Sequence, residues 1–397
     1  MKYFLRVILL LACASSPALA QRSLGTVEVA VDNSVLLVRV SGTTTELNDL
    51  ALRAFNSHGR YKLVATGYLY DIRFAPAGPA QVRVDITKGP GSAPFASETV
   101  PGTNPRHALL RAADVAVEKT NGLGLRGFFT ARLAFILDLG RVKEVCTSDL
   151  FFSSGEVKQV THFNVPSMSP RWSPDGSKII YTSFLKGFPD IYVLDLVTNR
   201  PEKIASFQGT NTGGRFSPSG RQIAMVLTGE GTPEIYVSDA QGHHVAPVTR
   251  THSDAAKATP CWSPDGGRIV FVMQPGPQLW VMSAAGGSPQ RLSTGFSYTA
   301  EPDWGRANPN KIACTVSAGR QYQIAVYDLS KGKAEVVSKA PFDGQEPCWL
   351  ADGRHVVYTA RSPSESRLCI LDTETGKSTP ISPASFGSAT QASVWTP

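Results

Sequence analysis

The sequence predicts a multidomain protein in which a small α+β N-terminal domain precedes an all-β, six-bladed β-propeller that is closed by the C-terminal strand. A Trp-Ser-Pro-Asp-Gly type motif recurs through the C-terminal two-thirds of the 397 residues, and the anchor aromatic residues stand 42–46 positions apart. That period is close to the length of one four-stranded propeller blade. The region before about residue 130 lacks the repeat and shows two amphipathic helical patterns. With 35 Gly and 28 Pro, the composition favours many short strands joined by tight turns.

The first twenty residues have the layout of a secretory signal peptide. Lys2 and Arg6 give a positive start, an apolar stretch follows at residues 7–14, and small residues end at Ala20. The apolar stretch is too short to span a bilayer, so we expect cleavage after Ala20 and a mature chain without a direct membrane span. The alternative is lipidation at Cys13, because the residues before it loosely resemble a lipoprotein cleavage box.

Composition and charge restrict the function classes. A hydrophobic fraction of 42% and a charged fraction of 18% describe a globular chain rather than a disordered one. The net charge is +7, but the sequence contains no run of basic residues, which argues against a nucleic-acid partner. Removal of the signal peptide with Cys13 leaves an odd number of cysteines in the exported chain. No two of them have the spacing of metal ligands. We therefore expect buried thiols, no metal site and no cofactor, whereas disulfide pairing stays open.

Residues 21–130 predict the α+β domain. Thr43 with Glu46 predicts a capping box for a first helix that ends at Gly59. Two alternating runs, centred on residues 68–74 and 82–86, predict strands. Asn104 followed by Pro105 predicts the start of a second helix, which residues 121–122 end. With about four strands, both helices are expected to cover one face of the sheet.

Residues 131–397 predict the propeller. Within each repeat, the Pro-Asp-Gly turn has the chemistry of a three-residue hairpin loop, with Gly in the left-handed position. The anchor aromatic is expected to pack between neighbouring blades, where a large flat side chain fills a wedge-shaped gap. The six anchors are Trp172, Phe216, Trp262, Trp304, Trp349 and Trp395.

The two ends of the repeat region predict how the ring closes. Residues 133–160 carry three strands without an anchor motif, whereas residues 392–397 carry an anchor with nothing after it. Together they make one complete blade, so the first and last segments are expected to pair and leave no open edge.

The order of these features resembles the TolB family, the periplasmic components of Tol–Pal systems. The segments that carry the resemblance are Asn121-Gly122, Arg126–Phe135 and Met168–Lys178, together with the signal peptide and the split blade. The N-terminal domain is shorter than is usual in that family. The resemblance implies a periplasmic scaffold with no catalytic residues, which supports outer-membrane integrity and envelope constriction during cell division.

The resemblance also implies two partners and their sites. The propeller of the family binds the peptidoglycan-associated lipoprotein Pal through loops at its mouth, and the N-terminal segment engages TolA, an inner-membrane protein. Here the N-terminal site is expected at Val27, Glu28 and Val29, which alternate as a strand that adds to a partner sheet should. The alternative is that this stretch is the first strand of its own domain. The positions expected at the mouth are Thr210, Asn211, Gly213, Ala258, Tyr298, Glu301 and Glu346. The family has His where Thr210 stands and Thr where Ala258 stands, so the binding chemistry has changed or moved.

Two other functional classes are open to a propeller of this kind. A sialidase- or peptidase-like propeller hydrolase acting in the periplasm is the main alternative, because related propellers accompany α/β-hydrolase domains and the Ser173–Gly176 turn loosely resembles an Asp-box. However, the chain shows no G-x-S-x-G elbow, and Trp172 precedes the Ser of the box instead of following its Gly. A carbohydrate-binding propeller, or one with a cation among the carbonyl oxygens of its channel, is a third possibility that no side-chain pattern demands.

Overall fold

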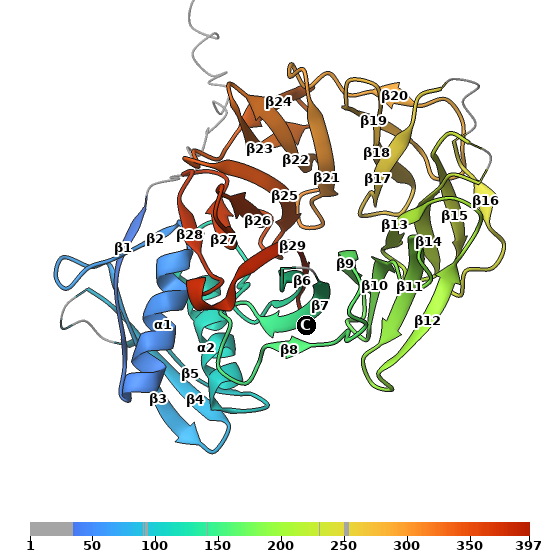
Figure 1. The fold of residues 1–397 in the computed structure, drawn as a ribbon. Helices are drawn as coiled ribbons and strands as arrows, with labels where there is room; N and C mark the ends of the chain where they lie inside the picture. The colour runs from blue at the N-terminus through green and yellow to red at the C-terminus, as the bar shows by residue number, and fades with distance from the viewer. Residues whose placement is uncertain (1–34, 90, 92–93, 141, 230, 250–253) are drawn as a thin grey trace, which may run out of the picture. The chain divides into compact units, whose positions relative to one another are not determined.

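The computed structural model describes an α+β sheet domain and a ring of six four-stranded sheets, over residues 35–397 except 90, 92–93, 141, 230 and 250–253 (Figure 1). This confirms the predicted fold class. The expected signal peptide and the expected N-terminal binding segment at Val27, Glu28 and Val29 lie outside the described residues. Within the described part, no helix has the length and apolarity needed to cross a membrane.

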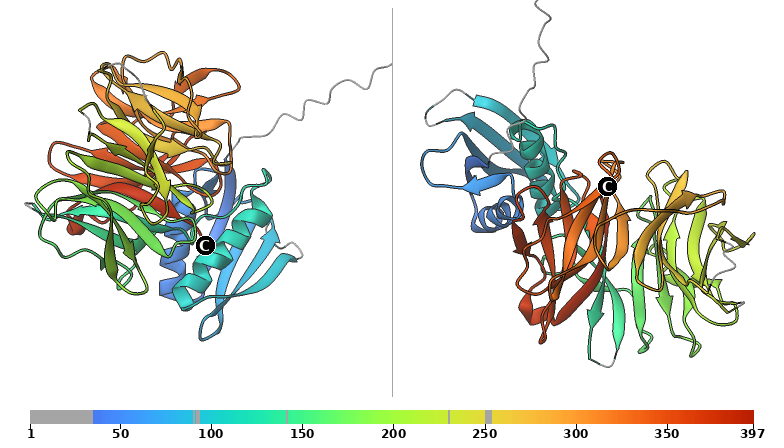
Figure 2. Two further views of the ribbon diagram at one scale, coloured as in Figure 1. Left: turned by 90° about the vertical axis from the view of Figure 1, so that its right-hand side faces the viewer. Right: turned by 90° about the horizontal axis from the view of Figure 1, so that it is seen from above.

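The described part of the N-terminal domain is a five-stranded mixed sheet, one strand more than predicted, with both helices on one face (Figure 1, Figure 2). The strand order is β2-β1-β3-β4-β5; β1 is parallel to both of its neighbours and the remaining pairs are antiparallel. Side chains that alternate along β3 and β4 are fully buried against the helices, as predicted. The bounds are β1 Leu36–Gly42, α1 Thr45–Ser57, β2 Tyr61–Leu63, β3 Tyr70–Gly78, β4 Gln81–Lys88, β5 Pro94–Pro101 and α2 Pro105–Thr120.

The second helix begins and ends where the sequence predicts. The side chain of Asn104 accepts a hydrogen bond from the N–H of His107 at 2.8 Å, and Pro105 occupies the first turn. Asn121 caps the other end, and Gly122 follows in the left-handed region with φ of 68°. This helix therefore has both of the termini that its residues favour.

The predicted cap of the first helix is wrong by one residue. Thr44, not Thr43, accepts the hydrogen bond from the N–H of Leu47, at 3.3 Å. Thr43 is unavailable as a cap because its own N–H donates to the carbonyl oxygen of Phe74 at 2.9 Å. That bond holds Thr43 beside β3, just past the end of β1, so the helix starts one residue later.

Each blade runs from an innermost strand at the propeller axis to an outermost strand. Blades 1 to 3 are β9 Ser167–Trp172, β10 Lys178–Ser183, β11 Asp190–Asp195, β12 Arg200–Ala205; β13 Asn211–Phe216, β14 Gln222–Leu227, β15 Glu234–Asp239, β16 Ala246–Pro247; and β17 Lys257–Trp262, β18 Arg268–Met273, β19 Gln278–Ser283, β20 Gln290–Arg291. Blades 4 and 5 are β21 Thr299–Trp304, β22 Lys311–Ala318, β23 Gln321–Asp328, β24 Lys333–Val336; and β25 Asp343–Trp349, β26 His355–Arg361, β27 Ser366–Asp372, β28 Ser378–Pro380. Blade 6 is β29 Ser388–Trp395, β6 Arg132–Asp138, β7 Lys143–Asp149 and β8 Lys158–Gln159, with a 3-10 turn at Ala384–Phe386 before β29.

Apolar side chains fill the wedge between each pair of neighbouring blades. The cluster between blades 2 and 3, for example, joins Val226 and Ile235 to the anchor Trp262. The interface between blades 5 and 6 is continuous with the core of the N-terminal domain. The five cysteines of the described chain are buried and unpaired, and most of them lie in these clusters. The anchors therefore pack between blades, as predicted.

The C-terminal strand closes the ring by pairing with β6, as predicted, but the last copy of the motif is displaced by one residue. Val394 pairs with Leu133 at the register position that Trp349 occupies opposite Val356 in blade 5. Trp395, predicted as the anchor, lies one residue further along. Its ring packs on the first turn of blade 1 so closely that a Cβ on Gly176 would lie 2.2 Å from it.

Candidate functional site

The described innermost strands each carry one residue with left-handed backbone at the same position, and we call this set the bulge ring. Its φ values lie between 47° and 67°. The pairing with the second strand shifts register at each of them, which defines a β-bulge. A bulge bends a strand and re-aims a side chain, and together these residues line one axial cavity of about 90 Å³. The bulge ring consists of Ser169, Gly213, Thr259, Glu301, Glu346 and Gln391.

Side chains of the bulge ring bind the backbone of the next blade. One carboxylate oxygen of Glu301 accepts from the N–H of Glu346 at 2.9 Å. A Glu346 oxygen accepts from the N–H of Gln391 at 3.0 Å, and the Gln391 oxygen accepts from the N–H of Ser169 at 2.7 Å. These bonds connect blades 4, 5, 6 and 1 in sequence around the axis.

The two glutamates place negative charge at the side of the channel that faces the mouth. Burial raises the pKa of Glu301 above its usual value, and the neighbouring Glu346 carboxylate raises it further. Thr315 donates its hydroxyl to Glu301 at 2.7 Å, and Thr359 does the same for Glu346 at the same distance. The pair is therefore hydrogen-bonded, yet it retains repulsion between two nearby acids.

A second layer of side chains lies two residues further along each innermost strand. Here Cys261, Asp303 and Ser393 accept hydrogen bonds from the anchor N–H of the following blade, at 3.2, 2.8 and 3.2 Å respectively. Arginine cannot accept such a bond, and blades 1 and 2 carry Arg171 and Arg215 at this position. Arg215 instead reaches across the axis and forms an ion pair with Asp303.

A larger cavity of about 790 Å³ lies beyond this layer, at the face of the Pro-Asp-Gly turns. Arg171 and Arg215 line both cavities, so the two are consecutive parts of one axial channel. The wall of the larger cavity combines turn residues and anchor aromatics with the segment between α2 and β6 and with the C-terminal residues 395–397.

The structure divides the residues expected at the mouth into two groups. Gly213, Glu301 and Glu346 belong to the bulge ring and line the smaller cavity. The other four do not line it: Thr210 is exposed, Asn211 is buried, Ala258 packs partly buried against an inter-blade cluster, and the ring of Tyr298 contacts that of Tyr322 in a tilted arrangement at 5.0 Å.

Asn211 holds a loop rather than presenting a free amide. Its Oδ1 accepts from the N–H of Phe207 at 3.0 Å, and its Nδ2 donates to the carbonyl oxygen of the same residue at 2.8 Å. A further bond from the Asn211 backbone N–H reaches the Pro189 carbonyl oxygen at 3.0 Å. Asn211 therefore fixes the loops that surround Thr210.

Sequence reasoning missed the exposed aromatic residues on these loops. Phe188 is 71% exposed, and Phe207 and Phe342 are each 47% exposed. Phe207 and Phe342 stand just before innermost strands, and Phe188 stands on the loop that Asn211 contacts. Both loop types belong to the mouth, the face where innermost strands begin. The available signal was a phenylalanine shortly before the innermost strand in blades 2 and 5.

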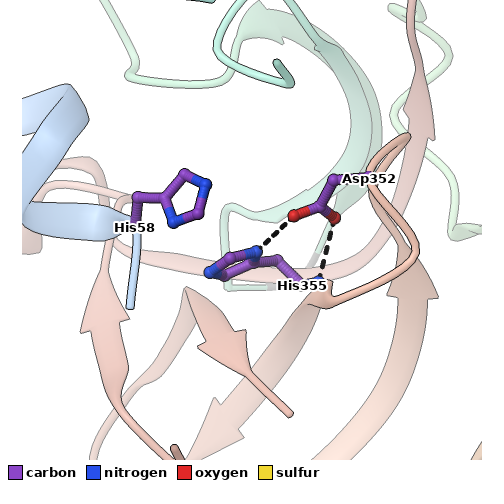
Figure 3. Close-up of side chains that lie close together, drawn as sticks. All are labelled: His58, Asp352 and His355. Carbon is purple, nitrogen blue, oxygen red and sulfur yellow. Dashed lines mark hydrogen bonds and ion pairs between the residues drawn. The ribbon is translucent and has the colours of Figure 1, made fainter. Parts of the chain in front are cut away.

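A buried histidine cluster connects the N-terminal domain with blade 5 (Figure 3). His58 follows α1, whereas Asp352 and His355 belong to the turn between β25 and β26 and to the start of β26. Nδ1 of His355 lies 2.5 Å from an oxygen of Asp352, and its Nε2 accepts from the N–H of Gly59 at 3.1 Å. The rings of His58 and His355 meet edge to face at 4.3 Å.

The imidazole nitrogens of this cluster have no free lone pair for a metal ion. A neutral imidazole offers one lone pair, and His355 uses its lone pair on Gly59 while Nδ1 of His58 accepts from the N–H of Arg60 at 3.2 Å. The remaining Nε2 of His58 therefore carries hydrogen; it is buried, with no partner among the described residues. Burial lowers the pKa of His58 well below its usual value, and the positive groups around it, His355 and Arg354 first among them, lower it further. We call this cluster, through which the N-terminal domain packs against blade 5, the His58 joint.

Comparisons with known proteins identify the family to which the propeller is similar. The family described as TolB beta propeller domain matches residues 120–397. The Tol-Pal system protein TolB of Bordetella pertussis is 39% identical over 186 residues, which are 46% of this chain and 41% of that protein. The match thus spans about two-fifths of the relative's length.

Solved structures agree on the fold. A crystal structure of TolB from Acinetobacter baumannii has a TM-score of 0.79 at 23% identity and covers 91% of this chain and 96% of its own. A chain of a nidogen/laminin complex has a TM-score of 0.55 at 13% identity, covering 67% of this chain and 98% of its own. Because such different proteins share the propeller, fold similarity by itself does not assign function.

Proposed function

Because this chain belongs to the TolB propeller family, we propose that it is a non-catalytic, periplasmic component of a Tol–Pal system. The propeller binds a Pal-like peptidoglycan-associated lipoprotein, and the N-terminal segment binds a TolA-like inner-membrane protein. This bridge supports outer-membrane integrity and envelope constriction during cell division. The family match over residues 120–397 is the observation that carries the proposal.

The mouth has the surface chemistry of a protein-binding site. Loops of several blades converge there, and the exposed rings of Phe188, Phe207 and Phe342 offer apolar area on a face whose loops are held by hydrogen bonds. Aromatic residues are enriched in the buried centres of protein interfaces. We assign direct partner contact to these rings and to Thr210, which follows Phe207 on the same loop and is exposed.

The other expected positions have supporting roles in this proposal. Asn211 fixes the loop of Phe207, whereas Glu301 and Glu346 lie deeper, where they hold the blades together and give the channel a negative end. Gly213 belongs to the same ring, and Ala258 and Tyr298 pack against neighbouring side chains.

The second partner site is proposed on the segment after the signal peptide. In this proposal the mature chain starts at Gln21, the N-terminal domain extends to residue 130 and the propeller begins at residue 131. Val27, Glu28 and Val29 alternate apolar and polar side chains, so the segment suits addition to the sheet edge of a partner.

A pull-down from envelope extract tests both sites at once. The bait is the tagged mature protein as wild type, with residues 21–32 deleted, or with Phe188→Ala and Phe207→Ala combined. We expect wild type to retain both partners, the deletion to lose the inner-membrane protein only, and the phenylalanine variant to lose the lipoprotein only.

The same preparations are assayed on glycosidase and peptidase substrates. Retention of both partners by both variants would overturn the site assignments. Turnover of any of these substrates by the wild type, abolished by a point substitution in the propeller, would replace the scaffold with an enzyme.

A further inference from the structure

The larger cavity at the turn face has the dimensions of a ligand site. Its volume of about 790 Å³ lies within the range of roughly 300–1,000 Å³ that small-molecule sites occupy. Its charged lining is mixed and contains four acids, Asp114, Glu118, Asp303 and Asp352, of which Glu118 is exposed. It also contains four arginines: Arg171 and Arg215 lie at its inner end, and Arg126 and Arg306, both exposed, belong to its rim.

The carboxylates that line the cavity are mostly engaged within the protein. Asp303 pairs with Arg215, and Asp352 contacts His355. Asp114 accepts from the N–H of Phe129 at 2.7 Å and from the hydroxyl of Thr130 at 2.8 Å, and burial raises its pKa to about 7. These acids therefore leave the positive charge of Arg171 without a dedicated counter-ion.

Arg171 forms no ion pair within the part of the chain that the structure describes. Its Nη1 donates to the carbonyl oxygen of Pro170 at 2.9 Å, and no carboxylate of the described chain lies within ion-pair distance of it. Burial lowers the pKa of Arg171 and the nearby Arg215 lowers it further, whereas Asp303 and Glu346 oppose these effects only in part. A guanidinium offers five N–H donors in a planar fork that matches an oxyanion.

The indole of Trp172 adds an independent observation. Trp262 and Trp349 occupy the same position in their blades, and their Nε1 groups donate to the carbonyl oxygens of Arg215 and Asp303, both at 3.0 Å. Nε1 of Trp172 is buried and has no acceptor among the described residues. Trp172 lines the same cavity as Arg171, its neighbour in the chain. Two adjacent residues thus leave hydrogen-bond donors unused beside one cavity.

We propose that this cavity binds a small organic oxyanion, a carboxylate or a phosphate ester, through paired N–H donors of Arg171. Arg126 and Arg306 attract the ligand at the rim, and the remaining volume accommodates the organic part. The site lies on the face opposite the mouth and goes beyond the proposed scaffold function. The oxyanion site and the scaffold function can therefore be refuted independently of each other.

Ligand titration of the intact mature protein tests the proposal. The probes are inorganic phosphate, glycerol 3-phosphate, succinate, and a tripeptide with either a free or an amidated C-terminus, in a buffer without other oxyanions and with chloride added to constant ionic strength. Binding is followed by calorimetry and by the fluorescence of the tryptophans that line the cavity. The control variant is Arg200→Gln, an exposed arginine on the outermost strand of blade 1.

We expect saturable binding of at least one oxyanion by wild type and by Arg200→Gln. Arg171→Gln should weaken it about tenfold or more, because charge-assisted bidentate bonds are lost. Arg171→Lys should give an intermediate value, since it keeps the charge without the fork. Preference for phosphates, or for the free over the amidated peptide, identifies which oxyanion the site selects.

Thermal unfolding provides a second readout. The preferred ligand should raise the unfolding temperature of wild type and leave that of Arg171→Gln unchanged. If Arg171→Gln is unfolded in buffer, Arg171→Lys and Arg306→Gln supply the same comparison. The proposal is overturned if no probe binds wild type saturably, or if the Arg171 variants bind as tightly as wild type.

Discussion

The side-chain oxygen of Gln391, in the last strand, accepts a hydrogen bond of 2.7 Å from the backbone N–H of Ser169, in the first blade, across 222 residues of sequence. The bond completes a relay that begins at Glu301 and passes through Glu346. Ring closure therefore depends on polar bonds around the axis as well as on the pairing of β29 with β6. Each acceptor is a long side chain that a bulge directs to the next blade.

Removal of the Gln391 acceptor should weaken closure. Gln391→Ala leaves the N–H of Ser169 without its partner, and the loss of one such bond costs about 1–2 kcal/mol of unfolding free energy. For a chain of this size we expect the midpoint of thermal unfolding to fall by roughly 2–4 °C per kcal/mol. Gln391→Glu keeps an acceptor for this N–H and is the matched control near pH 4.5, where repulsion from Glu346 is weakest. If Gln391→Ala unfolds at the wild-type temperature, the bond contributes nothing to closure.

Replacement of Glu301 by Gln should stabilise the propeller at neutral pH only. The folded state raises the pKa of Glu301 above its ordinary 4.5. Between the pKa of the unfolded chain and that of the folded chain, the folded chain binds more protons. Its stability therefore falls as the pH rises through this range. Gln cannot ionise, yet it keeps an oxygen for the N–H of Glu346, as Gln391 does for Ser169.

Denaturant unfolding at pH 7.5 and near pH 4.5 checks this expectation. We expect Glu301→Gln to be more stable than wild type at pH 7.5, because the folded state raises the pKa of Glu301, and to differ little from wild type near pH 4.5. A gain of equal size at both pH values would show that the charge of Glu301 is not its cause.

The parts of the fold that could be predicted have local signatures. The Pro-Asp-Gly turn encodes its own conformation, and Gly176 has the expected positive φ of 71°. The termini of α2 are set by residues adjacent to the helix, Asn104 and Asn121. The blade count and the split blade follow from the spacing of aromatic anchors, because each blade needs one to fill its wedge.

The rest depends on register and on distant contacts, which have no local signature. Ser169 and Glu301 have no preference for left-handed backbone, and only the pairing with the second strand imposes it. Alignment by Trp identity misplaced the last anchor because the pairing of Val394 with Leu133, rather than residue type, defines that position. His58 meets His355 only because the N-terminal domain packs against blade 5.

The His58 joint should make stability sensitive to acid. Because the folded state lowers the pKa of His58 well below 6.5, the unfolded chain binds the extra proton first, and stability is lost as pH falls through about 6.5. The charged and titratable groups around it are Arg60, Tyr61, Asp352, Arg354, His355 and Lys377, and Asp372 lies beside His355. His58→Phe keeps an aromatic ring against Phe128, whose ring lies 5.2 Å away, and cannot bind a proton.

Unfolding free energies at pH 7.5 and 5.5 test the role of the joint. We expect wild type to lose stability between the two pH values and His58→Phe to lose clearly less, even where the lost bond to the N–H of Arg60 lowers its absolute stability. His244→Gln, at an exposed position, is the control and should follow wild type. Identical pH dependence of His58→Phe and wild type would assign the acid sensitivity to other groups.

The exposed phenylalanines of the mouth should affect binding but not folding. Within the proposed function, Phe188→Ala and Phe207→Ala should each weaken binding of the Pal-like lipoprotein about tenfold, since loss of a buried aromatic contact costs 1–2 kcal/mol or more. The unfolding free energy should change by less than about 0.5 kcal/mol, as is usual for exposed side chains. Calorimetric titration with the purified lipoprotein measures the first quantity and denaturant unfolding the second.

Val197 provides the matched control for these two phenylalanines. It is 86% exposed and lies on the opposite face of blade 1, because the N–H of the adjacent Leu196 donates to Ser177 in the Pro-Asp-Gly turn at 3.0 Å. Val197→Ala removes a similarly exposed apolar side chain and should leave the affinity unchanged. If it weakens binding as much as Phe188→Ala and Phe207→Ala do, the lipoprotein does not distinguish the two faces, and its contact with the mouth must be abandoned.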